Sequence, residues 1–144
     1  MAQLVIRNDR ITEWVAERIP AAAGIGFGPS HSIGVVIEGR VASGVVFHDW
    51  QPRQGTIQLS IAAENPRWAS RANIRAILSY PFDQIGAIKV WAVIPHTNER
   101  VVRFAKALGF KQEGMLRHQF GVGIHAVFVG LMANEYYKQY RKDN

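Results

Sequence analysis

The chain has 144 residues, of which 48% are hydrophobic and 19% charged; it contains no cysteine, and its formal net charge is +6 at pH 7. This length and composition predict one domain over residues 1–144 and exclude disulfides, cysteine-ligated metals and a thiol nucleophile. No apolar run is long enough to span a bilayer and residues 1–10 lack the apolar segment of a signal peptide, so we expect a cytoplasmic protein without membrane binding.

The first half of the chain predicts a helix and three strands. Apolar residues at helical spacing predict a helix over 12–19, and the small, glycine-rich residues 21–29 predict a loop after it. Two β-rich runs, at 32–37 and 41–48, are separated by a short turn and predict a hairpin. Apolar and polar side chains alternate over Thr56–Ala63, which is typical of a strand with one buried face.

The second half predicts two helices and three further strands. An apolar helical face through Ile74 and Leu78 ends near Pro81. Asn98 is expected to cap the next helix at its start, and Gly109 to end it. Strands are expected over residues 88–94, 115–120 and 126–132. The polar and aromatic tail, 135–144, either extends the last strand or forms a short helix.

This order of elements predicts an α/β (α+β) fold in which helices flank a mixed sheet, because runs of antiparallel strands are joined by two helical crossovers. Strands 56–63 and 88–94 enclose one helix, so we expect them to be parallel and joined by a right-handed crossover.

The positive charge is concentrated in one third of the chain. Between Arg67 and Arg117 there are nine Lys and Arg residues and three acidic ones, and the rest is balanced. For charge alone, a solvated basic face explains this better than a specific nucleic-acid or lipid partner. Arg67, Arg71 and Arg75 also surround the predicted start of the helix after strand 56–63. A helix N-terminus with arginines around it favours a pyrophosphate, and an ordinary loop with solvated arginines is an equal alternative.

The second half of the chain also carries a run of spaced residues. They are Tyr80, Phe82, Gly86, the strand Ile88–Ile94, Asn98, Leu108-Gly109-Phe110, Glu113-Gly114, Arg117, Gly130-Leu131-Met132 and Glu135. In this order and spacing they resemble the Gcn5-related N-acetyltransferases, and within them the branch that acetylates protein N-termini, over about residues 56–135. The resemblance implies a single domain with a mostly antiparallel sheet and a central parallel strand pair that splays apart. Small members of this kind also occur in bacteriophage genomes.

The resemblance implies acetyl-CoA as cosubstrate and a site for it. Backbone groups of Ile61, Ala62 and Ala63 would hold the pantetheine arm, and Asn98 and Arg103 would contact the cosubstrate from the next helix. The family's loop pattern is Gln/Arg-x-x-Gly-x-Gly/Ala, and its best local match here is Arg67, Trp68, Ala69, Ser70, Arg71 and Ala72. Ser70 then replaces the first glycine. A register two residues earlier, from Asn65, places Trp68 at a glycine position.

Acetyl transfer to an amine requires a group that takes the proton from that amine. Glu64 follows strand 56–63 and is the first candidate for this base, the alternative being a loop carboxylate paired with Arg67. His118, expected on strand 115–120, is the second, the alternative being a structural or exposed histidine. The Tyr that many family members use as acid is replaced by Ala105. The histidines show no metal-ligand spacing, so no metal is predicted.

Three functions therefore compete. The first is an acetyl-CoA-dependent N-acetyltransferase acting directly on a protein N-terminus, a lysine or a small amine. The second is a catalytically inactive binding module on the same fold, because both loop registers lack the glycines. The third is an activity directed at nucleic acid, with which a sequence pI of about 10.1 is compatible. Homodimers are common in such folds, and the acceptor is not identified by the sequence.

Overall fold

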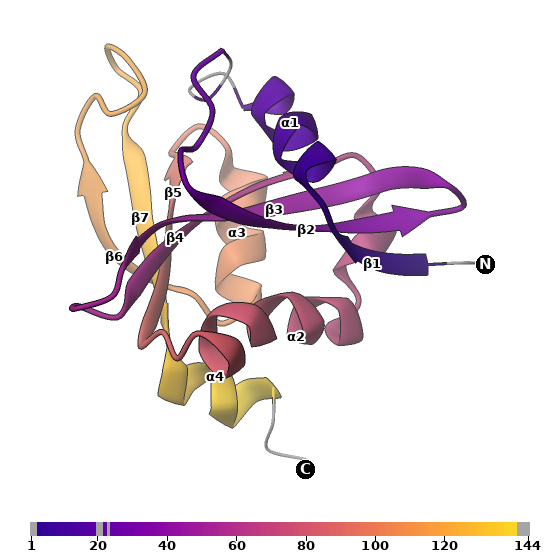
Figure 1. Ribbon diagram of the computed structural model, residues 1–144. Helices are drawn as coiled ribbons and strands as arrows, with labels where there is room; N and C mark the ends of the chain where they lie inside the picture. The colour runs from indigo at the N-terminus through magenta and orange to yellow at the C-terminus, as the bar shows by residue number, and fades with distance from the viewer. Residues whose placement is uncertain (1–2, 20–21, 23, 141–144) are drawn as a thin grey trace.

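A seven-stranded sheet of order β1-β2-β3-β4-β5-β7-β6 forms the centre of the computed structural model, which describes residues 3–19, 22 and 24–140. The strands are β1 Gln3–Arg7, β2 Ser30–Ile37, β3 Arg40–Gln51, β4 Thr56–Ala63, β5 Lys89–Pro95, β6 Lys111–Leu116 and β7 Ala126–Met132. All neighbouring strands are antiparallel except β4 and β5 (Figure 1). The predicted mixed sheet with one parallel pair is confirmed.

Within the described residues, four α-helices flank the sheet. They are α1 Asp9–Arg18, α2 Arg71–Ser79, α3 Glu99–Ala107 and α4 Ala133–Tyr140. A 3-10 turn, η1 Pro66–Ala69, precedes α2, and a π-helical turn, η2 Tyr80–Gln84, follows it. Helix α1 lies over one face of the sheet, and α2, α3 and α4 contribute to the core on the other (Figure 1). The tail therefore forms a helix as far as Tyr140, and residues 141–144 lie outside the described part.

The main core lies between the sheet and helices α2, α3 and α4, where buried aliphatic strand residues meet Ile74, Ile77, Ala105 and Tyr136. A second, smaller core lies under α1, where Ile11 and Val15 pack on Val46 of β3. The α1 face of the sheet carries glycines at Gly34 and Gly44. A Cβ at Gly44 would lie 2.5 Å from Val15 Cγ2, so these glycines let α1 contact the sheet directly.

Short polar side chains fix where the helices begin. Asn8, Ser70 and Asn98 accept bonds from Arg10, Asn73 and Val101 backbone N–H groups at the starts of α1, α2 and α3. Gly109 follows α3 with a φ of +108°, a conformation that glycine adopts without strain. The predicted caps at Asn98 and Gly109 are confirmed.

Two strands differ from the sequence-based expectation. Strand β1 was not predicted, and it forms the edge beside β2. The strand expected at 115–120 lies at 111–116, because the chain turns after Leu116 and His118 has a left-handed φ of +56°. His118 is therefore in a turn and not on a strand. Helix α1 begins three residues earlier than expected, after its Asn8 cap.

Candidate active site

The parallel strands β4 and β5 separate soon after they begin. Only Thr56, Ile57 and Gln58 of β4 pair with β5, opposite Lys89, Val90 and Trp91. Beyond this ladder β4 keeps its pairing with β3 as far as Ala63, and β5 keeps its pairing with β7 as far as Pro95. The side of β4 that faces β5 therefore has no strand partner from Leu59 to Ala63, which is the predicted splay.

The segment after β4 forms a compact turn that ends at the start of α2. Asn65 accepts a bond from Arg67 N–H through its side chain, and Trp68 N–H donates to Asn65 O. Trp68 is only 4% exposed and packs edge-on against Phe104 of α3, so its ring lies in the core rather than over the helix start. The outer surface of this helix start carries the small, exposed side chains of Ser70 and Ala72.

The first turn of α2 offers backbone donors. Ser70 Oγ caps Asn73 N–H at 3.1 Å. The N–H groups of Arg71 and Ala72 have no carbonyl acceptor within the helix, so they point outwards from its first turn. This geometry suits an anion, because the helix dipole adds partial positive charge at the same place.

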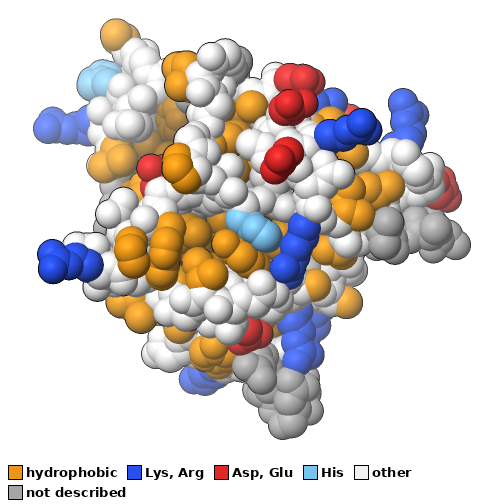
Figure 2. Space-filling model, viewed as in Figure 1, with side chains coloured by type: hydrophobic (Ala, Val, Ile, Leu, Met, Phe, Trp, Pro, Cys, Tyr) orange, Lys and Arg blue, Asp and Glu red, His pale blue; other side chains and the backbone are white. Residues whose placement is uncertain are grey.

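The predicted arginines have different surroundings. Arg71 donates to Gln139 O at 2.5 Å and lies over the Tyr140 ring, so it holds α4. Arg67 is exposed and, within the described chain, makes no ion pair, so it is available to a ligand at the start of α2. Arg103 is exposed on α3. In Figure 2, Lys and Arg side chains are spread over the visible face rather than gathered in one patch.

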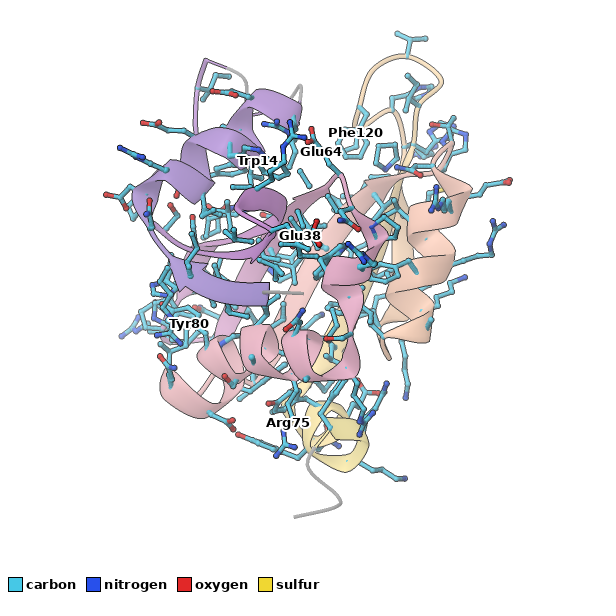
Figure 3. The ribbon with its side chains drawn as sticks, turned by 90° about the vertical axis from the view of Figure 1, so that its right-hand side faces the viewer. Trp14, Glu38, Glu64, Arg75, Tyr80 and Phe120 are labelled. Atoms are coloured by element: carbon cyan, nitrogen blue, oxygen red, sulfur yellow. The ribbon has the colours of Figure 1, made fainter. Side chains whose placement is uncertain are left out.

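Glu64 lies at the rim of the site. Its Oε2 accepts a bond of 2.8 Å from Arg18 Nε, and Arg18 also lies over the Trp14 ring at 3.8 Å. The alternative that paired Glu64 with Arg67 is therefore wrong, because the partner is Arg18 at the end of α1. Figure 3 shows Glu64, Trp14 and Phe120 at the same end of the molecule, opposite Arg75, which lies towards α4.

His118 and His125 lie in the loop between β6 and β7, and hydrogen bonds connect them to His96, which follows β5. His118 Nδ1 accepts a bond from Gly123 N–H at 2.8 Å, and His118 N–H donates to His125 Nδ1 at 2.9 Å. His125 N–H donates in turn to His96 Nδ1. Burial lowers the pKa of His125, and the positive charges of His118, His96 and Arg117 lower it further. These histidines hold the loop at the end of the molecule where Glu64 lies.

Sequence reasoning missed a polar group on the sheet itself. His48 of β3 is 6% exposed; its Nδ1 lies 2.5 Å from Asp49 Oδ2 and its Nε2 lies 2.8 Å from Ser60 Oγ of β4. Phe27 packs against the His48 ring at a centroid distance of 5.0 Å. The signal in the sequence was a His-Asp dipeptide at a strand end and a serine on the polar face of the next strand, which does not by itself predict contact.

The face of the sheet that carries His48 also carries aromatic residues. Gln58 is opposite both His48 on β3 and Trp91 on β5, so these three side chains share one face. Trp91 stacks on Phe128 of β7 with ring centroids 4.9 Å apart. Both rings are half-buried, so the face beside the splay has an apolar wall and a polar group next to it.

Within residues 3–19, 22 and 24–140, no three His, Asp or Glu side chains are placed to hold a metal ion. In the same described ranges, no helix has the length and apolar character of a membrane span.

Comparison with known proteins identifies relatives by structure. No family model matches the chain. No curated protein sequence matches it. A solved protein classed as an acetyltransferase is 24% identical over 77% of this chain and 61% of its own, with a TM-score of 0.66. The spermidine/spermine N-acetyltransferase from Vibrio cholerae is 12% identical over 95% of this chain and 96% of its own, with a TM-score of 0.76.

A third structure is the ribosomal-protein-S5-alanine acetyltransferase from Vibrio fischeri, 14% identical over 74% of this chain and 63% of its own, with a TM-score of 0.63. The chain spans only 61–64% of the length of the first three structures that it matches. At these identities the comparisons establish the fold. The strand order, the splayed β4–β5 pair and these matches together show that the chain has the fold of the Gcn5-related N-acetyltransferases.

Proposed function

We propose that the chain is an acetyl-CoA-dependent N-acetyltransferase that moves an acetyl group directly to an amine. The observation that carries this proposal is the splay of β4 from β5 with the start of α2 directly beyond it. An edge of unpaired strand followed by a helix N-terminus suits an extended ligand that ends in phosphates. Two of the structural relatives are named for amine acceptors, spermidine/spermine and the alanine of ribosomal protein S5, which fits this proposal.

The residues present fit acetyl-CoA at two places. The backbone groups of Ile61, Ala62 and Ala63 that do not face β3 lie along the open edge of β4 and would hold the pantetheine arm. The first turn of α2 would hold the pyrophosphate, because Ser70 and Ala72 are small and Trp68 points into the core. Acetyl-CoA would supply an activated acyl carbon to the acceptor amine.

The rest of the site would select and position the amine. Trp91 and Phe128 form an apolar wall on the α1 face of the sheet beside the splay, and Glu64 follows the far end of β4. We propose that the Glu64 carboxylate attracts a cationic amine to the site. To act as a base, Glu64 must first lose its hydrogen bond to Arg18. A protein N-terminus, a lysine or a small polyamine would each present such an amine.

An activity on nucleic acid has less support. Two lysines of the basic segment are neutralised within the fold, because Lys89 pairs with Glu113 and Lys111 pairs with Glu135. A third cation, Arg71, binds the end of α4. Three of the nine cations of the basic third are therefore engaged within the fold, which leaves fewer of them to contact a phosphate backbone.

Titration calorimetry with acetyl-CoA, CoA and 3′,5′-ADP tests the proposal. We expect acetyl-CoA to bind with a micromolar Kd and to stabilise the protein against heat. The variant Ser70→Asp keeps a good helix cap and adds a negative charge, so we expect it to weaken binding at least about tenfold. Asn8→Asp makes the matched change at the start of α1 and should leave binding unchanged. No binding at millimolar acetyl-CoA would refute the proposal and favour the inactive module.

A further inference from the structure

We propose that Ser60, His48 and Asp49 form a proton relay that takes the proton from the acceptor amine. This inference rests on the proposed function and assigns the base for it. The group consists of a hydroxyl, an imidazole and a carboxylate joined by bonds of 2.8 and 2.5 Å. The relay differs from both bases predicted from sequence, since Glu64 is paired with Arg18 and His118 accepts a backbone N–H.

A distortion of β3 brings Asp49 to His48. Neighbouring residues of a regular strand point to opposite faces, so a carboxylate directly after a histidine would normally point away from it. The pairing of β3 with β4 shifts register between His48 and Gln51, and Asp49 has a left-handed φ of +55°. A non-glycine residue in this region is strained, and such strain persists where the surrounding structure holds it. Here it turns the Asp49 carboxylate back onto His48 Nδ1.

The relay requires one arrangement of the protons. An ionised carboxylate only accepts, so in the relay a neutral His48 carries its proton on Nδ1 and donates a hydrogen bond to Asp49. His48 Nε2 is then an acceptor, and the Ser60 hydroxyl must donate to it. The remaining lone pairs of Ser60 Oγ are left for a donor outside the relay. An ammonium or amine N–H is a donor of this kind.

The position of Ser60 places the relay at the splay. Gln58 is the last β4 residue paired with β5, and Ser60 is the next residue on the same face of β4. Ser60 is half-buried, whereas His48 is shielded by Phe27 and by the sheet. A hydroxyl is therefore accessible beside the open β4 edge, and the base behind it is kept from water.

The proton transfer balances without a further reactant. The N–H bond of the acceptor ammonium breaks and a bond forms from that proton to Ser60 Oγ, while the original Ser60 proton passes to His48 Nε2. The acceptor keeps the electron pair and becomes a neutral nucleophile. His48 becomes an imidazolium whose charge the Asp49 carboxylate stabilises, as in other Asp-oriented histidine bases. Ser60 is unchanged at the end of the step.

The first test is the tautomer of each histidine, measured by long-range proton–nitrogen NMR on the histidine-labelled protein above pH 7. We expect His48 to carry its proton on Nδ1. His118 and His125 are internal controls, because their Nδ1 atoms accept backbone N–H groups and their protons must lie on Nε2. A His48 ring protonated on Nε2 would overturn the relay whatever the turnover.

The second test measures CoA release and acetyl-CoA affinity in Ser60→Ala, with spermidine and a peptide with a free N-terminal alanine as acceptors. We expect kcat to fall about a hundredfold with unchanged acetyl-CoA affinity. In His48→Ala, imidazole should restore part of the rate and pyrazole, a non-basic ring of the same size, should not. If His48→Ala does not fold, Ser60→Ala and Asp49→Asn still decide, because both leave the His48 ring in place.

The outcomes separate the relay from the proposed function. Retained acetyl-CoA binding with wild-type kcat in Ser60→Ala overturns the relay alone. An acetyl adduct on Ser60, seen as a mass increase of the intact protein, also overturns it, because the serine would then be a nucleophile. Absence of acetyl-CoA binding by the unmodified protein overturns the proposed function and the relay with it.

Discussion

Gly44→Ala should destabilise the protein through α1, the helix whose Arg18 binds Glu64. A Cβ at this position would lie 2.5 Å from Val15 Cγ2 and 2.9 Å from Ile11 Cγ2. Both side chains are at most 1% exposed, so they have no free space to move into and α1 must shift away from β3. Overpacking of this kind costs about 1–3 kcal/mol. For a chain of this size the same range lowers Tm by about 3–10 °C.

Urea and thermal unfolding measure this effect. Gly114→Ala is the matched control, because its Cβ would have no atom within 4 Å and we expect a change of at most about 0.5 kcal/mol. Adding Val15→Ala to Gly44→Ala removes the closest methyl group, so the double variant should be less destabilised than the sum of the two single variants. Equal unfolding free energies for Gly44→Ala and Gly114→Ala would refute the close packing of α1 on the sheet.

Three further changes test the surroundings of the site. Asn98→Ala removes the cap of α3 and should lower the unfolding free energy by about 1 kcal/mol in urea titrations; no loss would contradict the cap. Burial first, and then neighbouring cations, lower the pKa of His125 below its ordinary value of 6.5, so the unfolded chain takes up this proton at a higher pH than the folded protein does. The free energy of unfolding therefore keeps its full value above pH 6.5 and falls as the pH decreases below it. His125→Asn should reduce the pH dependence of the unfolding free energy, measured by urea titrations at a series of pH values. An unchanged pH dependence would contradict the role given to His125. Arg71→Ala removes the bond to Gln139 and should speed hydrogen exchange in α4 while leaving α3 unaffected.

The fold could be predicted where local pattern and packing agree. Strand β4 and strand β7 begin and end where the sequence predicts, because one alternates and the other is an apolar run on a buried strand. Strand β6 could not be placed, because it is an edge strand whose side chains are mostly exposed and therefore carry no alternation. The apolar residues that suggested a later strand, such as Phe120, belong to the loop that follows β6.

The site could be predicted only in its backbone. The helix start follows from the order of elements, whereas the splay was expected only from the family resemblance. Ser70 was expected to replace the first glycine of the loop pattern, and the structure shows that it also caps α2. The side-chain partners depend on contacts between distant segments. Glu64 binds Arg18, which precedes it by 46 residues, and Ser60 binds His48 diagonally across two strands. Asp49 turns towards His48 because of a backbone distortion that no residue pattern in this sequence predicts.

The short β4–β5 ladder makes the sheet a structure of two halves. Strands β1 to β4 form one continuous antiparallel set and β5 to β7 another, and three residue pairs join them. In mechanical terms this ladder is a seam, so opening of the sheet under load or heat should begin there. A ligand bound along the free edge of β4 and held by α3 would span the seam. Its binding would therefore lock the two halves together, and the melting of both would become one cooperative event.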